Sequence, residues 1–375
     1  MATTFFSPHN PFFALFPPPS LLAAPFAAVW FSTDAVVLME FAVGSRGPYF
    51  SRFAKRDLPP GVIVGGAVTD EVRLREALRE LKEESGAERV RLVLPDEKIY
   101  LFTVGLPMLS PKETRDNISF QIEENVPLSL EESVFDYTLI PEGSVRGIRA
   151  PRRAAVVVME KSLLEPYLRA ATTVGLEALS VEAESQALAR AVVPLQAAES
   201  RLLVHIGRDC AGVHIASRGV VQYASCVDIG EASFDAALKK SFPQASPQEV
   251  EEMKRSHSFT GAPKDKEFVA ALVGGISALQ DEINRRYLYW HSREEVEALS
   301  HPPIASVTLS GAPAVLKGLA EHLSEGLRLP VVVADPWVNA PAQGRSVRPV
   351  PLPEALAKAP AIGGALRGLI EPLYA

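Results

Sequence analysis

The sequence has little cysteine, no excess of basic residues and no long apolar run, and each shortage excludes a class of protein. Its 375 residues include two cysteines, Cys210 and Cys226, too few for a disulfide framework. We expect buried thiols, with a contact across one hairpin as the alternative. A net charge of −7 argues against a nucleic-acid surface, which needs clustered lysine and arginine. No uninterrupted run of about 20 apolar residues is available to span a bilayer. These shortages favour a cytoplasmic protein.

The apolar stretch that comes nearest to a membrane span is Pro11–Phe31. Several prolines interrupt it, so it cannot be one helix. It also lacks the basic start of a signal peptide, because the first Lys or Arg is Arg46. We expect residues 1–25 to form a Pro-rich apolar arm on the protein or on a partner, with a membrane-surface contact as the alternative.

Motifs of common catalytic and phosphate-binding sites are also missing from the sequence. It contains no G-x-S-x-G, H-E-x-x-H, G-x-G-x-x-G or G-x-x-x-x-G-K-[ST]. His205 and His214 could suggest a metal pair. In a hairpin turning near Arg208-Asp209, however, residue 205 pairs with residue 213, which places His214 on the opposite face. We therefore predict no catalytic and no metal-binding residues.

What the sequence does contain is the same pattern twice. Apolar runs at Leu202–Ile206, Ala211–Ser217 and Val220–Val227, separated by short turns, predict a three-stranded meander. The stretch Val29–Phe53 repeats this plan, with a tight turn at Thr33-Asp34.

Each half then continues with an apolar strand, a helical pattern and a second strand, which is typical of a crossover in a parallel sheet. The segments are Ala154–Met159, Ser162–Val174 and Ala178–Val181 in the first half, and Val307–Leu309, Pro313–Leu327 and Val331–Ala334 in the second. The repeat predicts an internal duplication, with two similar α/β lobes facing each other across a cleft.

A block between the first meander and its crossover predicts a small inserted α/β subdomain. A helix over Val72–Ser85, with Asp70 as N-cap and Gly86 as stop, precedes this block. The block contains strands at Val90–Leu94, Ile99–Val104 and Ser133–Ile140, and a helix opened by a capping box at Ser110-Pro-Lys-Glu113.

The second lobe carries three further predicted helices. A capping box at Ser246 starts one, Phe268–Trp290 forms a long amphipathic one, and Ala359–Leu373 forms the last. The predicted division is an arm (1–25), a first subdomain (26–88 and 151–200), an inserted subdomain (89–150), a second lobe (201–345, with inserted helices at about 230–300) and a linker with a helix returning to the first lobe (346–375).

Several motifs together resemble one family. They are EENVPL (Glu123–Leu128), FDY (Phe135–Tyr137), LSVEAESQALARA (Leu179–Ala191), an E-x-x-K helix, LSGAPAVLKGL (Leu309–Leu319) and AIGGALRGL (Ala361–Leu369). In this order they resemble the PilM family of type IV pilus assembly proteins, relatives of FtsA and actin, over Ala27–Leu369. The resemblance implies a two-lobed actin-like (ribonuclease H-like, duplicated) fold and ATP as a possible cofactor.

It also implies a cytoplasmic scaffold, peripheral to the inner membrane, that binds the N-terminal tail of a PilN-type membrane protein. Other pilus-machine components and self-association are further implied contacts. The tail is expected in a groove between the first subdomain and the inserted one, where a peptide could extend a strand edge with roughly micromolar affinity. We predict Phe120, Glu124 and Tyr137 as its contacts.

The chain departs from the family in its nucleotide loops. The first loop of the family carries Asp and Lys where this chain has Trp30 and Val37, and the Asp of the second loop is His205. Four positions match and form the predicted vestigial nucleotide site: Gly207, Glu251, Lys254 and Gly311. Alternatively, Glu251 and Lys254 form a surface ion pair, and the two glycines are turn residues that need φ > 0.

The missing acids would position Mg²⁺ and the attacking water, and the missing lysine would face the phosphates. We therefore predict no hydrolysis and expect no cofactor. Two other functions stay open: an actin-like ATP-binding switch, and an FtsA-like membrane-tethered filament protein. The second would need a basic amphipathic helix on a C-terminal linker, whereas this sequence stops just past its last predicted helix.

Overall fold

The structure is a computed structural model and describes residues 26–44, 47–107, 110–141, 144–145, 148–149, 152–259, 262–292, 302–340 and 350–370. The predicted Pro-rich arm over 1–25 lies outside the described residues. Among the described residues, none of the helices combines the length and the apolar character needed to cross a membrane.

The first sheet combines a meander with two parallel strands. β1 (Phe26–Phe31), β2 (Ala35–Gly44) and β3 (Gly47–Asp57) are antiparallel, and β6 (Arg89–Leu94) and β12 (Glu177–Ala183) continue the sheet in parallel beside β1. The order is β12-β6-β1-β2-β3. Both faces of β1 and β2 are covered, which explains why these two strands are apolar almost without alternation.

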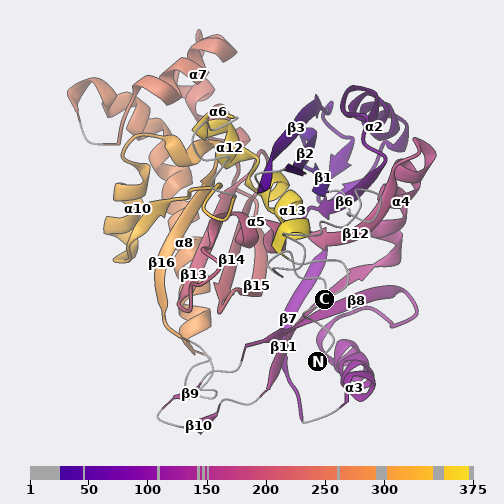
Figure 1. Ribbon diagram of the computed structural model, residues 1–375. Coiled ribbons are helices and arrows are strands. Elements are labelled where there is room, and N and C mark those ends of the chain that lie inside the picture. Colours follow the sequence, from indigo (N-terminus) through magenta and orange to yellow (C-terminus); the bar gives the residue numbers. More distant parts are fainter. Residues whose placement is uncertain are drawn as a thin grey trace.

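The second sheet repeats this topology. β13 (Ser200–Ile206), β14 (Ala211–Ser217) and β15 (Val220–Val227) form the meander, and β16 (Ile304–Gly311) and β17 (Val331–Val333) continue it in parallel. The order β15-β14-β13-β16-β17 mirrors that of the first sheet. The predicted duplication into two α/β lobes is therefore confirmed, and the lobes stand side by side in Figure 1.

A third, smaller sheet corrects two strand assignments. It consists of β7 (Ile99–Gly105), β11 (Arg153–Glu160) and β8 (Ser133–Ile140), in the order β7-β11-β8, and packs on α3 (Pro111–Asn125). The strand predicted at Val90–Leu94 for the inserted block belongs to the first sheet instead. The strand predicted at Ala154–Met159 for the first-lobe crossover belongs to the small sheet. Both strands are buried along almost their whole length, so their own sequences fit either sheet.

Helices α5 (Glu184–Val192) and α13 (Ala359–Ile370) lie between the two large sheets (Figure 1). They share one hydrophobic core with both sheets, so the two lobes are not packed independently. On the outer face of the first sheet lie α2 (Glu71–Ser85) and α4 (Lys161–Thr173). The predicted caps of α2 are confirmed: Asp70 accepts a hydrogen bond from the Arg73 N–H, and Gly86 is left-handed.

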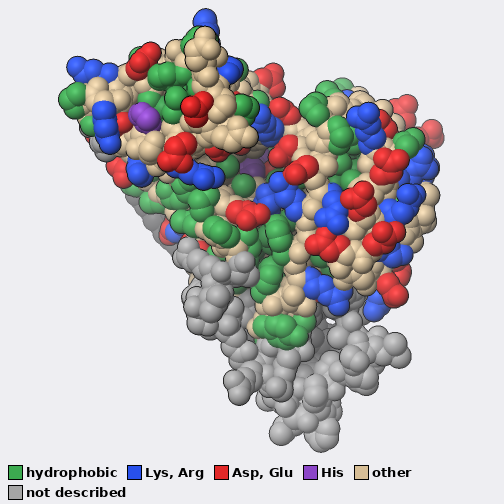
Figure 2. Space-filling view, turned by 90° about the horizontal axis from the view of Figure 1, so that it is seen from above, with side chains coloured by type: hydrophobic (Ala, Val, Ile, Leu, Met, Phe, Trp, Pro, Cys, Tyr) green, Lys and Arg blue, Asp and Glu red, His purple; other side chains and the backbone are tan. Residues whose placement is uncertain are grey.

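The remaining elements surround the second sheet or are short. They are α6 (Glu231–Ser241), α7 (Pro247–Ser256), η1 (Pro263–Asp265), α8 (Lys266–Ser292), η2 (Ala312–Val315), α10 (Leu319–Leu327), α12 (Leu352–Ala357), β4 (Ile63–Val64), β5 (Ala67–Val68), β9 (Ser144–Val145) and β10 (Ile148–Arg149). Both predicted capping boxes, at Ser110 and Ser246, are present. The face in Figure 2 shows basic and acidic side chains interspersed over the first lobe, without a single-sign field.

Candidate functional site

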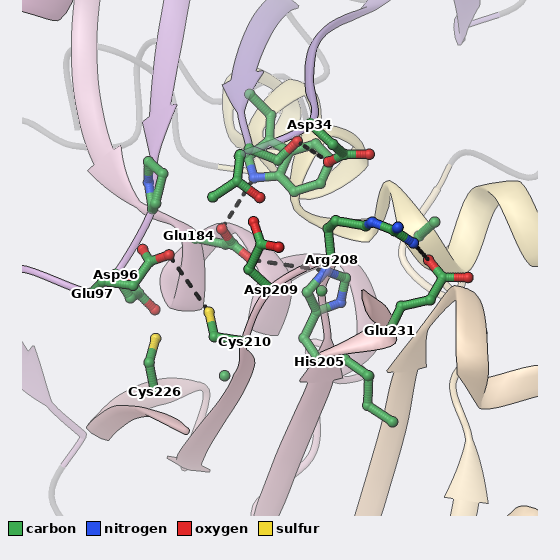
Figure 3. A pocket seen from close by; sticks show the side chains of 18 of the residues that line it. Asp34, Asp96, Glu97, Glu184, His205, Arg208, Asp209, Cys210, Cys226 and Glu231 are labelled. Carbon is green, nitrogen blue, oxygen red and sulfur yellow. Dashed lines mark hydrogen bonds and ion pairs between the residues drawn. The ribbon is translucent and has the colours of Figure 1, made fainter. Parts of the chain in front are cut away.

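The interlobe cleft is built from corresponding turns of the two lobes (Figure 3). Residues 32–34 between β1 and β2 face residues 207–210 between β13 and β14. The first lobe adds Asp96 and Glu97 after β6, and Glu184 at the start of α5. Because β1, β6 and β12 run parallel, their carboxyl ends meet at one edge of the sheet, as in other α/β ligand sites.

Trp30 and His205 stand where the resemblance implies acids, and both lie beside Glu184. The Trp30 indole N–H donates to Glu184 Oε2 at 3.2 Å, and His205 Nε2 lies 3.8 Å from Glu184 Oε1. The other ring nitrogen of His205 is 2.8 Å from the Ser310 hydroxyl. A continuous polar chain therefore runs from β1 through α5 to β13 and β16, across the two lobes. Val37, the third departure, is fully buried.

The prediction for His214 was wrong. The register pairs His205 with Gly212, not with residue 213, because the turn between the two strands holds residues 207–210. His214 therefore faces the same side as His205 and lines the cleft. Its Nδ1 lies 3.6 Å from Asp96 Oδ2, while Asp96 Oδ2 also accepts a hydrogen bond from the Ser185 N–H.

The cleft holds more acids than bases. Its acidic lining residues are Asp34, Asp96, Glu97, Glu184, Asp209 and Glu231. The two cations are Arg208 and Lys358, and Arg208 is engaged by Asp235 at 2.5 Å. The cleft thus offers a polyphosphate few available counter-charges.

Burial sets the protonation of the groups in this cleft. It raises the pKa of Asp96 to about 7, and it raises the pKa of Glu184 well above its usual value, helped by the neighbouring Asp96 and Glu97 carboxylates. It lowers the pKa of His205 to about 4 and that of His214 to about 3. The acid–imidazole contacts are therefore not ion pairs near neutral pH, because both imidazoles are neutral.

The four predicted nucleotide residues do not meet in one pocket, since only Gly207 lines the cleft. Gly311 has φ 95°, and a side chain there would overlap the Ile206 carbonyl, so it is a turn glycine as the alternative interpretation expected. Gly207 does not have a positive φ. It is close-packed instead, because a Cβ there would lie 3.0 Å from the Cys210 carbonyl oxygen.

Lys254 is buried within a group of three acids. Its ammonium lies 2.7 Å from Glu231, 2.8 Å from Asp235 and 2.5 Å from Glu251. Burial would lower its pKa, but these hydrogen bonds raise it above the usual value. The pair Glu251–Lys254 is thus an ion pair, as the alternative expected, but with a buried lysine. The same carboxylates are the only described group with metal-ligand spacing, and the ammonium occupies their centre.

These residues do not fit ATP, the cofactor that the resemblance implies. Trp30 lines the cleft in place of an acid, excess carboxylates face the space, and Lys254 is already neutralised by three partners. Sequence reasoning also missed Asp96, Glu97 and Glu184. A signal existed, because each follows the carboxyl end of a predicted apolar strand, where ligand sites of parallel sheets are found.

A second depression lies between the small sheet and the first lobe; we call it the groove. Its small-sheet side is formed by β8 and β11, through Val134, Asp136, Thr138, Val157 and Met159 among others. Its first-lobe side carries Leu164, Val181, Glu182, Ala183, Gln186 and Arg367. β8 is an edge strand of its sheet, and among the described residues no strand pairs with its outer side. The groove thus mixes apolar side chains with Asp136, Glu182 and Arg367, and a free backbone edge lies beside it.

The predicted partner contacts are divided by the structure. Tyr137 lines the groove and also a shallow hollow between β8 and the start of α3. Phe120 is 74% exposed on α3, and Glu124 is exposed on the same helix. Neither of them lines the groove.

Known proteins resemble this architecture closely. The family described as type IV pilus assembly protein PilM matches residues 28–369. The solved structure "PilM-PilN type IV pilus biogenesis complex" is 20% identical with a TM-score of 0.74, covering 92% of this chain and 98% of that chain.

Two structures of MreB5 of Spiroplasma citri, bound to ADP and to AMPPNP, are each 12% identical. Their TM-scores are 0.52 and 0.51, with 93% and 92% of this chain and 98% and 95% of those chains covered. No curated protein matches the chain. The fold is therefore actin-like, and the chain belongs to the PilM family of type IV pilus assembly proteins.

Proposed function

We propose that this protein is a non-enzymatic scaffold that binds the cytoplasmic N-terminal tail of a PilN-type inner-membrane protein in the groove. The observation that carries the proposal is the groove itself, a partly apolar depression beside the unpaired edge of β8. The similar PilM–PilN complex supports a partner of this kind. The protein would then be cytoplasmic and held at the membrane through that partner. Contacts with other pilus-machine components and self-association belong to the same proposal.

The groove suits an extended peptide for two reasons. The outer backbone groups of β8 can accept a further strand, which supplies main-chain hydrogen bonds. Val134, Asp136 and Thr138 are alternate residues of β8 and therefore lie on the same face, toward the groove. Every second side chain of a peptide paired with β8 would face them. Val157 and Met159 of the neighbouring β11 extend the apolar floor. A short segment on this surface is expected to bind with roughly micromolar affinity, about −8 kcal/mol.

The absence of enzymatic activity is proposed from the cleft. An ATP-hydrolysing site needs an acid to hold Mg²⁺ and orient water. Trp30 instead donates a hydrogen bond to Glu184, His205 lies 3.8 Å from the same carboxylate, and Lys254 is fully engaged by carboxylates. Nucleotide-bound relatives with this fold exist, so an ATP-binding switch is the competing function.

A synthetic peptide of the partner tail, titrated against the full chain by isothermal titration calorimetry, tests the groove. Val134→Asp should weaken binding at least about 30-fold, because it places a carboxylate in an apolar contact. Val72→Asp on α2 is the matched control, since Val72 is also an exposed valine but lies away from the groove. Tail binding that survives Val134→Asp in a folded protein would overturn the groove assignment.

A further inference from the structure

The edge of β8 is free of a partner strand, but side chains of the protein itself bind two of its backbone groups. The Phe135 carbonyl accepts a hydrogen bond from Arg115 Nη2 at 3.4 Å. The Tyr137 N–H donates to Asp136 Oδ1 at 2.9 Å. β8 pairs with β11 on its other side, and backbone groups of alternate residues point to the same side of a strand. Both groups therefore belong to the outer edge.

Arg115 is held at this edge by more than one contact. Its guanidinium carbon lies 4.3 Å from the centre of the Phe135 ring, which is a cation–π distance. On α3, Arg115 stands three and seven residues before Ile118 and Ile122, whose side chains are fully buried against the small sheet. The packing of α3 thus brings the guanidinium to both the ring and the carbonyl of one β8 residue.

A strand added to β8 needs the same two backbone groups. In a parallel pair, one residue of the added strand donates to a carbonyl and accepts from the N–H two residues further along. For the residue placed beside Asp136, these groups are the Phe135 carbonyl and the Tyr137 N–H. In an antiparallel pair, the two groups belong to neighbouring pairing positions. In either direction, the added strand meets occupied groups at the middle of β8.

We propose that Arg115 and Asp136 form a cap on the edge of β8, which every added strand must displace. The inference rests on the proposed function, because it concerns the edge where the tail is proposed to bind. A peptide that offers only main-chain hydrogen bonds exchanges existing bonds for similar ones and gains little. A peptide that also buries side chains against Val134 and Val157 in the groove gains enough to open the cap. The cap thus protects the edge from unspecific pairing, which is the hazard of an exposed strand edge.

The test is the affinity of a labelled partner tail for full-chain variants, measured by fluorescence polarisation. Arg115→Met keeps an apolar side chain on the Phe135 ring but removes the donor, and Asp136→Ala removes the acceptor. The double variant should bind the tail about fivefold more tightly than the wild-type protein. That factor corresponds to two hydrogen bonds of about 0.5 kcal/mol each.

Two control variants separate the hydrogen bonds from the charges. Asp136→Asn loses the charge but keeps an oxygen that accepts from the Tyr137 N–H, so it should bind the tail as the wild-type protein does. Lys112→Met removes a positive charge from the hollow beside the same edge and should also leave the affinity unchanged.

Hydrogen exchange of the Tyr137 amide reports on the cap without the tail. In the free protein, this amide should exchange about threefold faster in Asp136→Ala than in Asp136→Asn, after correction for the intrinsic rates of the two sequences.

The outcomes distinguish the cap from the groove. Tail binding that is abolished by Val134→Asp but unchanged in the double variant would overturn the cap and leave the proposed function intact. Asp136→Asn binding as tightly as the double variant would also overturn it, since charge would then set the affinity. Tail binding that survives Val134→Asp would overturn the groove assignment, and the cap with it.

Discussion

The two depressions of this molecule, the interlobe cleft and the groove, differ in how far the protein itself occupies them. In the interlobe cleft, the Trp30 indole donates a hydrogen bond to Glu184, and His205 lies 3.8 Å from the same carboxylate. The groove mixes apolar and charged side chains, and the backbone edge of β8 beside it has no partner strand among the described residues. Side chains of the protein itself thus occupy the first site, whereas the second has a free backbone edge.

The comparison separates the parts of the molecule that repeat between the two lobes from the part that is added to the first lobe. Both large sheets keep the same strand order, and the turns that face each other across the cleft are retained. The small sheet, inserted between β6 and β12, brings the new surface. Each prediction below tests one side of this contrast.

The largest expected effect is on stability at the wall of the groove. Glu182 is buried and accepts two hydrogen bonds from Arg190, at 3.0 and 2.9 Å, with Arg367 at 3.3 Å. Glu182→Gln removes the charge between two guanidinium groups, and urea unfolding should show a loss of about 3 kcal/mol. Glu199 forms an exposed ion pair with Arg201 and serves as the control. Glu199→Gln should lower the free energy of unfolding by less than about 1 kcal/mol. Equal losses for the two variants would contradict a buried anchor at the groove.

A smaller effect is expected on tail binding at the predicted contacts. Tyr137→Ala should weaken binding about tenfold, or about 1.4 kcal/mol, because Tyr137 lines the groove. Phe120→Ala and Glu124→Ala, on α3, test whether the tail reaches beyond it. Fluorescence polarisation with a labelled tail measures all three, with melting temperatures as a check of folding. If none of the three variants weakens binding, the predicted contacts are wrong.

The Asp96 carboxyl in the cleft should lower stability as the pH rises. The pKa of Asp96 is about 7 in the folded protein against 3.8 when unperturbed, so the stabilisation is complete below the unfolded value and lost as pH rises through about 7. Between about pH 6 and about pH 8, ionisation of Asp96 should cost about 1 kcal/mol in urea unfolding, measured as the difference between the wild-type protein and Asp96→Asn. His205 and His214 act oppositely, because their unfolded imidazoles protonate as the pH falls through 6.5, while the folded pKa values are about 4 and 3. Asp96→Asn keeps both histidines, so the comparison cancels their contribution.

The smallest expected effect is that of nucleotide, which should be zero. Millimolar Mg-ATP should leave the melting temperature unchanged, and the protein should release no phosphate above a blank, with or without a membrane partner. The reason is the missing acids and lysine at Trp30, His205 and Val37. Magnesium-dependent ATP binding in calorimetry would favour the switch instead. Phosphate release that His205→Ala abolished would refute the prediction outright.

Features that depend on neighbouring residues were predictable from the sequence. The meanders, the caps at Asp70, Ser110 and Ser246, and the duplication follow from local pattern. The sequence did not predict which sheets β6 and β11 join. Strands that are buried along almost their whole length carry no signal that selects one neighbouring strand over another.

The cleft was harder to predict than the fold. A register different by one residue placed His214 on the wrong face, since side chains alternate with a period of two. The Trp30–Glu184 hydrogen bond joins residues 154 positions apart, which no local pattern encodes. The acids Asp96 and Glu184 were visible at strand ends, but the strand order that unites them was not.

The position of α13 has a consequence for how the protein is made. This helix packs against β1 and α5, and its Gly363 and Gly364 approach Ala187 and Ala28 so closely that a Cβ would collide. β1 ends at Phe31, whereas α13 starts at Ala359. At about 5–20 residues per second, the ribosome needs roughly 20 to 60 seconds between them. The inner face of the first sheet must stay uncovered during that time, so the lobe that is synthesised first is completed last.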